Sequence, residues 1–468
     1  MASVRLHTGE VIDGFTIGQR LHVGGMATLW EVTHPDHAIP MVLKAPLLNE
    51  GEDPASIVSF EMEQMILPRL SGPHVPRFIA AGDFEVRPYI VMERLQGKSL
   101  LSRLDDLPLP PAEVADLGAR IALALDDLHR QHVVHLDVKP SNLMFRPDGT
   151  AVLIDYGLSR HAQLPDLMEE EFRLPYGTAP YMAPEQVMGN RREPRADLFA
   201  LGVLMYFFAT GVRPFGDPQR LRGLKRRIWR DPVPPRQRRP DLPPWLQETI
   251  LRCLEVDPAH RHPTAAQLAH DLQHPEQIAL TARAERIRRD SWFTAFKRRF
   301  ALGVPPPNLF TRPTADGAAD APIVAVAIDF ERTPRDLAEA LRRTAGQILA
   351  ALPGARLACL NVLETNLISP DSSLDAEGRN KHVLRLVDLK HWAAPLGLAD
   401  DRVTFHVLEE RGVAASILEY VRVNRVDHII MGARADTRMR SLLGSVSAEI
   451  AAHAPCSVTV VRPRHHRK

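Results

Sequence analysis

Acidic, amide and basic side chains occur in the first third of the sequence in an order that suits chemistry on phosphate groups. Lys44 ends an apolar run, and Asp137, Lys139 and Asn142 follow in one short segment ahead of Asp155. Carboxylate and amide oxygens are the hard ligands that Mg²⁺ prefers, and a lysine ammonium is a point charge suited to phosphates. Phosphoryl transfer needs phosphates held still, their charge neutralised and an attacking hydroxyl oriented. These residue types therefore indicate a phosphoryl-transfer site.

A helix is predicted over residues 57–70. It carries two glutamates, either of which could face the cleft between the lobes. Glu61 and Glu63 lie roughly 200° apart around a helix, so only one of them can face inward. Glu63 shares its stripe with apolar side chains. We therefore expect Glu63 to pair with Lys44 and Glu61 to face solvent.

Two adjacent glycines, Gly24 and Gly25, lie between two apolar, strand-like runs. Because they lack a Cβ, their backbone N–H groups can approach phosphate oxygens closely. A Gly-Gly turn in a hairpin is by itself far more often only a turn. Strand-like runs over residues 1–100 and helical patterns over 112–275 predict a strand-rich lobe and a helical lobe with a cleft between them.

Three segments resemble the motifs of protein kinases, in the same order along the chain. His135–Asn142 resembles the catalytic loop, Asp155–Gly157 the metal-binding loop, and Tyr176–Glu185 the end of the activation segment. Arg261 also falls where that family places the partner of Glu185. This resemblance implies the α+β bilobal protein-kinase fold.

The kinase resemblance spans residues 12–275, with an N-terminal lobe over about 12–95 and a C-terminal lobe over about 96–275. It implies a Ser/Thr protein kinase that uses ATP with Mg²⁺, or alternatively Mn²⁺, and acts on Ser and Thr hydroxyls of protein substrates.

The same resemblance implies a role for each site residue. Asp137 would be the catalytic base and Lys139 would steady the transferring phosphoryl group, while Asn142 and Asp155 would hold the metal. The expected ATP-binding positions surround the adenine and the phosphates: Leu21, Gly24, Gly25, Leu29, Val42, Lys44, Glu63, Glu93, Leu95 and Met144. The expected activation-segment positions are Thr178, Glu185 and Arg261.

The sequence departs from the kinase pattern at four positions, of which Val42 only replaces the usual alanine beside adenine. His22 and Ala27 stand where the family has the first and third glycines of its phosphate loop, so the alternative function is a scaffold that binds ATP and transfers slowly. Leu136 stands where many kinases have the arginine that pairs with a phosphorylated activation loop. Since residues 158–175 are acidic and offer only Ser159 as a hydroxyl, we expect activity without loop phosphorylation.

Residues 276–320 differ in composition from what precedes them. The stretch 281–300 has seven basic and two acidic residues, with Trp292 and three phenylalanines between them. An amphipathic helix packed on one of the lobes is the simpler interpretation, and contact of 281–303 with an anionic membrane surface is the alternative. The prolines and the Ala/Gly/Asp-rich run that follow indicate a linker.

From residue 322 onward, apolar runs alternate with helical patterns, which predicts a parallel sheet with helices on both faces. Residues 322–463 resemble the universal stress protein family in the run Val324–Asp329 and in the glycine-bearing stretch 432–447. That resemblance implies an α/β doubly wound fold with a five-stranded parallel sheet.

Two interpretations of this C-terminal domain stay open. Nucleotide-binding members of the family hold phosphates on a G-x₂-G-x₉-G-S/T stretch that opens a helix, but here Ala435 replaces the second glycine and the following gap is one residue shorter. The domain is therefore either a stress-sensing or nucleotide-binding unit, or a module for homodimerisation or partner docking. The expected nucleotide positions are Asp329, Val362, Gly432, Gly444 and Ser445.

Net charge, apolar runs and cysteine content indicate which kinds of partner and which cellular compartment to expect. A net charge of +1 over 468 residues gives no general attraction to nucleic acid, so we expect no nucleic-acid partner. No apolar run reaches the ~18 residues of a membrane span, and the N-terminus lacks an apolar signal core. Three well-separated cysteines are typical of core residues in a reducing compartment. We therefore expect a cytoplasmic protein.

Overall fold

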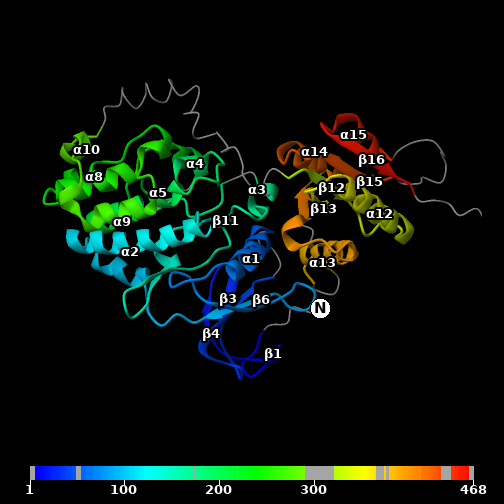
Figure 1. Cartoon of the computed structure of the whole chain (residues 1–468), viewed down its shortest axis with the longest axis horizontal. Helices are drawn as coiled ribbons and strands as arrows, with labels where there is room; N and C mark the ends of the chain where they lie inside the picture. The colour runs from blue at the N-terminus through cyan, green and yellow to red at the C-terminus, as the bar shows by residue number, and fades with distance from the viewer. Residues whose placement is uncertain are drawn as a thin grey trace, which may run out of the picture.

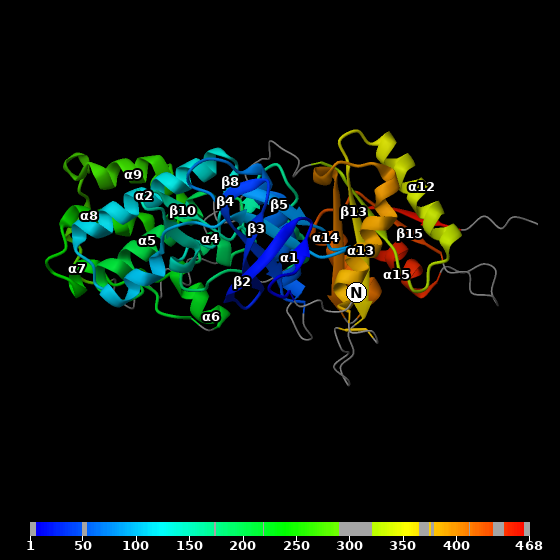
Figure 2. The same ribbon diagram turned by 90° about the horizontal axis from the view of Figure 1, so that it is seen from below.

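The computed structural model of the chain contains two bodies that lie side by side (Figure 1). The first has a strand-rich lobe and a helical lobe, and the second is a sheet covered by helices (Figures 1 and 2). The structure describes residues 6–48, 54–172, 175–218, 220–289, 321–364, 374–375, 379–410, 412–433 and 444–462.

The N-terminal lobe is built on a six-stranded antiparallel sheet with the strand order β1-β2-β3-β4-β6-β5. Its strands are β1 (Val11–Ile12), β2 (Phe15–Val23), β3 (Ala27–His34), β4 (His37–Pro46), β5 (Phe78–Gly82) and β6 (Tyr89–Glu93). Along β4, Met41 and Leu43 are buried while Val42 and Lys44 between and after them are only partly covered. This alternation turns Val42 and Lys44 toward the opposite face of the sheet, where the cleft lies.

Helix α1 (Pro54–Ile66) begins at a proline, which needs no N–H partner in a first turn, and ends in a 3₁₀ turn over Leu67–Arg69. Every residue from Ala55 to Glu63 is buried, so the helix is covered on all sides. The prediction that Glu61 faces solvent is wrong, since its exposed fraction is 7%. The C-terminal body covers the face of α1 that the sequence pattern assigned to water.

The helical lobe surrounds α5 (Arg195–Thr210), which is apolar on all sides and buried along almost its whole length. Gly211 adopts a left-handed conformation with φ 74° and ends this helix, as glycine commonly does at a helix C-terminus. Helix α2 (Pro111–Arg130) packs on both α5 and α9 (Ala265–Gln273).

The remaining described helices of this body are α3 (Leu167–Glu171), α4 (Pro184–Val187), α6 (Leu221–Leu224), α7 (Pro235–Arg238), α8 (Pro244–Cys253) and α10 (Ala282–Glu285). Its short strands are β7 (Lys98–Ser99), β8 (Val133–Val134), β9 (Leu143–Phe145), β10 (Ala151–Leu153) and β11 (Arg160–His161). The hairpin of β9 and β10 carries the loops that hold the candidate site.

The C-terminal body is a five-stranded parallel sheet with the order β14-β13-β12-β15-β16, which confirms the predicted doubly wound fold. Its strands are β12 (Ile323–Ala327), β13 (Arg356–Glu364), β14 (Val403–Glu410), β15 (His428–Gly432) and β16 (Ser457–Val461). Its helices are α12 (Arg335–Ala351), α13 (Lys381–Ala393), α14 (Val413–Val423) and α15 (Ser445–His453). Along β12, Val324 and Val326 join the apolar cluster of α12 and α13, whereas Ala325 joins that of α14 and α15. Helices therefore cover both faces.

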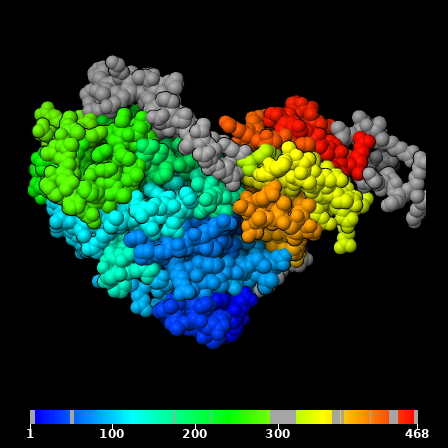
Figure 3. Space-filling view, viewed as in Figure 1, coloured from blue at the N-terminus to red at the C-terminus, as the bar shows by residue number. Residues whose placement is uncertain are grey.

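The two bodies are in contact, with the C-terminal body (yellow to red) lying against the first body in the space-filling view (Figure 3). One cluster of buried apolar residues runs from the helical lobe into the face of the sheet that α12 and α13 cover. In both ribbon views α1 is the N-terminal-lobe helix on the side of α13 (Figures 1 and 2).

The described part of the basic segment, residues 281–289, packs on the helical lobe. Arg283 lies in α10 and pairs with Glu248 and Glu255, and the Gln247 amide donates hydrogen bonds to backbone carbonyls of this segment. Trp292 and the three phenylalanines that follow it lie outside the described residues. None of the described helices combines the length and the apolar character that crossing a membrane requires.

A fully buried ion pair joins the end of the predicted activation segment to the base of the helical lobe. The Arg261 guanidinium donates to both carboxylate oxygens of Glu185 at 2.5 and 2.7 Å, and both side chains are 0% exposed. Arg261 also donates to the backbone carbonyls of Glu255, Val256 and Arg195. Since most of the guanidinium donors have partners, this pair is a fixed structural joint.

Arg261→Met tests that joint. Removal of one member of a buried pair leaves the other charge uncompensated, which typically costs about 3–5 kcal/mol. We expect the free energy of unfolding in urea to fall by about that amount. Asp116→Asn is the control, because its pair with Arg120 is half exposed and should contribute less than about 1 kcal/mol. Equal unfolding midpoints for Arg261→Met and the wild type would contradict the prediction.

Candidate active site

Lys44 brings three separate parts of the chain together in the cleft. From β4, its Nζ donates to Oε2 of Glu63 on α1 at 2.5 Å and to Oδ1 of Asp155, in the loop after β10, at 2.9 Å. The expected pairing of Lys44 with Glu63 is present. Glu63 is almost fully buried, whereas the Asp155 side chain is 45% exposed toward the cleft.

The charges of this triad stabilise one another. Burial alone would lower the pKa of the Lys44 ammonium, but the neighbouring Asp155 and Glu63 carboxylates outweigh burial and raise that pKa above its ordinary value. Lys44 in turn holds the pKa of Asp155 below its usual range. Burial raises the pKa of Glu63 against the opposing effect of Lys44. At neutral pH the lysine therefore carries its charge, as a group that contacts phosphates needs to.

The catalytic loop and the metal-binding loop each contain a residue in a backbone conformation that side chains rarely adopt. Leu136 and Asp155 have positive φ angles of 63° and 68°. Such conformations cost about 1–3 kcal/mol each and persist where surrounding contacts hold them. Asp197, which is 1% exposed, accepts hydrogen bonds from the backbone N–H groups of His135 and Leu136 at 2.9 and 2.8 Å. The buried carboxylate thus fixes the start of the loop.

Asp137 lies at the centre of a dense hydrogen-bond network. Its Oδ1 accepts from the backbone N–H and the hydroxyl of Thr178 at 3.0 and 2.7 Å. Its Oδ2 accepts from Lys139 Nζ at 2.6 Å and from the Asn142 amide at 3.1 Å. These donors fix the orientation of the carboxylate. Sequence reasoning placed Thr178 only in the activation segment and did not foresee that it contacts Asp137.

The chemistry of Asn142 and Asp155 fits a bound Mg²⁺. The Asn142 amide nitrogen donates to the backbone carbonyl and the carboxylate of Asp137, while its amide oxygen accepts from the Ser141 hydroxyl at 3.2 Å. Mg²⁺ is typically held by one or two carboxylates or carbonyls together with substrate phosphates and water. Among the described residues, no cluster of three or more His, Cys, Asp or Glu side chains is arranged to hold a metal without such help.

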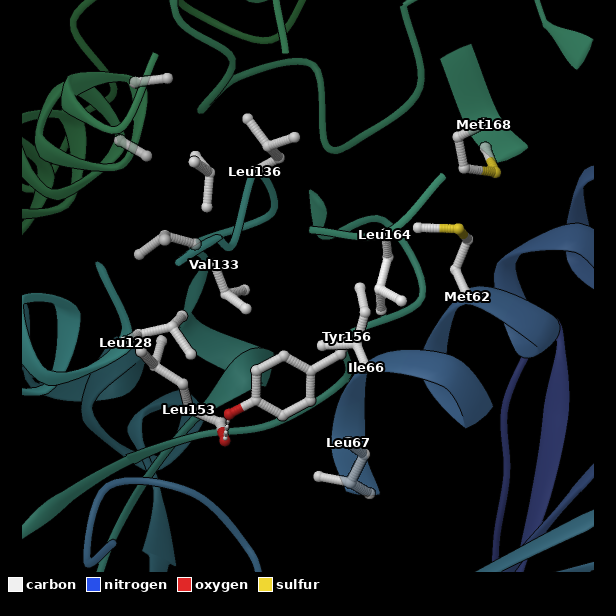
Figure 4. Packing of buried hydrophobic residues seen from close by; sticks show 14 of the residues in the cluster. Met62, Ile66, Leu67, Leu128, Val133, Leu136, Leu153, Tyr156, Leu164 and Met168 are labelled. Atoms are coloured by element: carbon white, nitrogen blue, oxygen red, sulfur yellow. Dashed lines mark hydrogen bonds between the residues drawn. The ribbon is translucent and has the colours of Figure 1, made fainter. Parts of the chain in front are cut away.

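A stack of buried side chains connects the site to α1. The His135 and Tyr156 rings lie 5.5 Å apart between centroids, and the Tyr156 hydroxyl donates to the Leu153 carbonyl. Figure 4 shows Tyr156 in one buried cluster with Leu67 and Ile66. Gly157 follows directly, and a Cβ there would come within 2.1 Å of the Ser59 hydroxyl. Glycine is therefore required where the metal loop meets α1.

The residues expected around adenine come from strands of both lobes, β2, β3, β4 and β9. The side chains Leu21, Leu29, Val42 and Met144 are all partly exposed rather than buried, as walls of an open site would be. The Glu93 N–H donates to the Arg77 carbonyl, so this N–H already has a partner within the protein. Leu95 lies two residues further along the same connection.

The glycine pair forms a tight hairpin between β2 and β3. The Gly24 N–H donates to the Ala27 carbonyl at 2.9 Å. A Cβ on Gly24 would lie 3.3 Å from that carbonyl oxygen, whereas a Cβ on Gly25 would meet nothing within 4 Å. Close packing within the protein therefore does not explain the glycine at position 25.

The residues proposed for a second nucleotide site lie at one edge of the C-terminal sheet. Asp329 follows β12, Val362 is near the end of β13 and Gly432 ends β15, while Gly444 immediately precedes α15, which Ser445 begins. Residues 434–443, which connect the two glycines, lie outside the described residues. A Cβ on Gly432 would come within 2.9 Å of Leu337, so packing against α12 accounts for that glycine. The nucleotide interpretation stays a prediction.

Comparison with known proteins gives two family matches. Residues 15–273 match the model of the protein kinase domain, and residues 322–462 match that of the universal stress protein family. Serine/threonine-protein kinase PknB of Mycolicibacterium smegmatis is 30% identical over 289 residues, which cover 58% of this chain and 46% of the relative. A probable serine/threonine-protein kinase of Clostridium perfringens, CPE1738, is 30% identical over 215 residues, which cover 46% of this chain and 31% of the relative.

The chain thus spans less than half the length of these curated relatives. The crystal structure of the Mycobacterium tuberculosis PknI kinase domain is similar with 25% identity and a TM-score of 0.46, over 58% of this chain and 99% of that one.

Glu63→Gln tests the Lys44 triad. The amide keeps the size of the side chain but removes the charge that holds Lys44 against α1, so the lysine is left with Asp155 alone. We expect kcat/KM for ATP-dependent phosphoryl transfer to fall by about 10–100-fold, because small displacements of a positioning group have effects of that size. Initial rates at varied ATP concentration measure this.

Glu31→Gln is the matched control, since its pair with Arg94 is about 40% exposed on the same lobe. An unchanged kcat/KM in Glu63→Gln would show that Lys44 needs no partner on α1.

Proposed function

The chain belongs to the protein kinase family, and on that premise we propose that it transfers the γ-phosphoryl group of ATP to Ser and Thr hydroxyls of proteins. The observation that carries this proposal is the convergence of the Lys44–Glu63–Asp155 triad and the Asp137 network in one cleft. In this proposal Lys44 contacts the α- and β-phosphates, and Asn142 and Asp155 hold Mg²⁺. The bound metal supplies neutralisation of phosphate charge.

Asp137 is proposed to orient the attacking hydroxyl. A carboxylate has about four lone-pair sites, and those of Asp137 already accept from Thr178, Lys139 and Asn142. An incoming hydroxyl therefore has to displace one donor. Lys139 is the donor on a flexible stem, and its ammonium is suited to phosphate oxygens. We infer that Lys139 leaves Asp137 for the transferring phosphoryl group when ATP and substrate are bound.

Asp137 needs little strength as a base for this role. The transition state of phosphoryl transfer is loose, so catalysis depends mainly on positioning and on stabilisation of charge. A carboxylate held by several hydrogen bonds is rigid, and rigidity serves positioning. The Thr178 hydroxyl joins Asp137 to the activation segment, which links substrate contact to the geometry of the loop.

Asp137→Asn tests the proposed activity. The amide occupies the same space but cannot accept the hydroxyl proton, so we expect the rate of phosphate transfer to a protein substrate to fall by about 10²–10⁴-fold. Binding of ATP·Mg²⁺ should persist, because Lys44 and Asp155 are intact. Transfer is measured with γ-labelled ATP, and binding by calorimetry.

Asp148→Asn is the control, since Asp148 caps its own turn between β9 and β10 by accepting from the Thr150 N–H. Full transfer by Asp137→Asn would contradict the role of Asp137. ATP binding without transfer by the wild-type chain would favour the alternative of an ATP-binding scaffold.

A further inference from the structure

The short helix α3 lies in the predicted activation segment and contacts the C-terminal body (Figure 1). It contains three consecutive glutamates, Glu169, Glu170 and Glu171. Glu170 is 7% exposed. A buried carboxylate is costly unless it is paired and hydrogen-bonded, and the partners of Glu170 come from the other body.

Four side chains of the C-terminal body converge on Glu170. From β13, the Arg356 guanidinium lies 2.7 Å from Oε1 and donates to Oε2 at 3.3 Å. From α14, the Tyr420 hydroxyl donates to Oε2 at 3.1 Å, and the amide of Asn424, the residue after α14, donates to the Glu170 backbone carbonyl at 3.1 Å. From β14, His406 Nε2 forms an ion pair with Oε2 at 3.0 Å.

His406 is fully buried between two glutamates of α3. Its Nδ1 lies 2.8 Å from Glu171 Oε1. Burial opposes the charge on the ring, but Glu170 and Glu171 outweigh it and raise the pKa of His406 to about 9. Burial likewise opposes ionisation of Glu170, and Arg356 and His406 lower its pKa to about 2. At neutral pH two cations of the C-terminal body therefore face Glu170.

The opposite end of α3 is held by the helical lobe. Asp166 caps the helix by accepting from the Glu169 N–H, and its carboxylate accepts from Arg191 at 2.7 Å. Arg191 also donates to the Leu158 carbonyl, close to the metal loop. The kinase body thus anchors the start of α3, while the C-terminal body anchors its end.

Helix α3 packs directly on α1, the helix that carries Glu63. Leu167 and Met168 are buried in the same cluster as Met62 and Ile66 of α1. Figure 4 shows the Met168 and Met62 side chains close together, on the side of the cluster away from Leu128. Because Met62 directly precedes Glu63, a shift of α3 changes the packing next to the Lys44 partner.

The C-terminal body also reaches α1 itself. Lys390 of α13 donates to Glu61 Oε1 at 2.8 Å, and its ammonium lies 5.0 Å from the centre of the Phe84 ring and 5.8 Å from that of Phe405. Glu61 and Glu63 project from opposite sides of α1, and each is paired. One side of the helix is therefore held by the cleft and the other by the second body.

We propose that Arg356 and His406 are positioning residues for phosphoryl transfer, and that the C-terminal body thereby acts as a built-in activator of the kinase body. They hold Glu170, Glu170 holds α3 against α1, and α1 holds Glu63 on Lys44. This inference rests on the proposed kinase activity. The kinase resemblance leads one to expect an arginine at position 136, but the residue there is Leu136. In the proposal, Arg356 and His406 bind the acidic activation segment instead.

The direction of the effect follows from the geometry of the docked state. With the C-terminal body in place, the Lys44–Glu63 and Lys44–Asp155 pairs are closed and Thr178 contacts Asp137. Docking is thus compatible with an assembled site. Loss of docking leaves Glu170 and Glu61 without their partners and removes support from α1.

A double-mutant cycle in the full chain tests this proposal. Arg356→Met and Glu170→Gln should each lower kcat/KM for transfer by about 10–100-fold, the size expected for displacement of a positioning group. The double variant should lose no more than either single variant, because both act through one contact. Arg356→Lys should recover most of the loss, since it keeps the charge although not the guanidinium fork.

Arg422→Met is the matched control, since Arg422 lies on the surface of α14 and pairs with Glu419 of the same helix. Hydrogen exchange provides a second readout independent of activity: amides of α1 and α3 should lose protection in Arg356→Met, while those of α12 and α15 keep theirs. Loss of protection throughout the C-terminal body would mean that Arg356→Met unfolds that body. The test then rests on Glu170→Gln, which leaves the sequence of the C-terminal body unchanged.

Unchanged or increased kcat/KM in Glu170→Gln would overturn the proposal, as would additive losses in the double variant. Failure of the proposed function can be distinguished from failure of this inference. If the proposed function is wrong, the wild-type chain itself shows no phosphate transfer that depends on Asp137. In that event, unchanged protection of α1 in Arg356→Met would still refute the positioning role.

Discussion

One ammonium group shared by two carboxylates holds together three parts of the chain that are distant in sequence. Lys44 belongs to a strand, Glu63 to a helix and Asp155 to a loop, and the lysine contacts both acids. Because a buried charge is costly unless it is paired, movement of the helix away from Lys44 would leave the buried Glu63 carboxylate without its cation. The sheet, α1 and the metal loop are thereby held in one relative position, and the catalytic geometry depends on it.

The requirement that a buried charge be paired also applies at the boundary between the two bodies. Glu170 is as buried as Glu61, and both find their cations in the C-terminal body, in Arg356 and Lys390. Each acid belongs to an element of the kinase body that is free to move in principle, α3 or α1. Burial of these acids makes docking and the position of those elements a single equilibrium. The C-terminal body can in this way influence a site to which it contributes none of the Lys44, Glu63 or Asp155 side chains.

The kinase body contains both rigid and adjustable ion pairs, and they lie in different places. The Glu185–Arg261 pair is fully buried, and its guanidinium also donates to several backbone carbonyls, so the base of the activation segment is fixed. Lys139 instead reaches Asp137 on a flexible stem and is partly exposed. A fixed pair at the base of the activation segment and an exchangeable Lys139 beside Asp137 suit a site that has to bind and release charged ligands.

The sequence alone determined the kinase motifs, the two-lobed fold, the five-stranded second domain and the choice of Glu63 over Glu61 as the partner of Lys44. These follow from local patterns, since helical periodicity places Glu63 on the apolar stripe and short motifs carry the site chemistry. Only the tertiary structure decided the fate of Glu61 and Glu170. An acidic side chain on a polar helix face has the same pattern whether water or a distant arginine lies opposite. Which of the two it is depends on the docking of a domain whose Arg356 lies 186 residues beyond Glu170 and whose Lys390 lies 329 residues beyond Glu61, and no local pattern records those contacts.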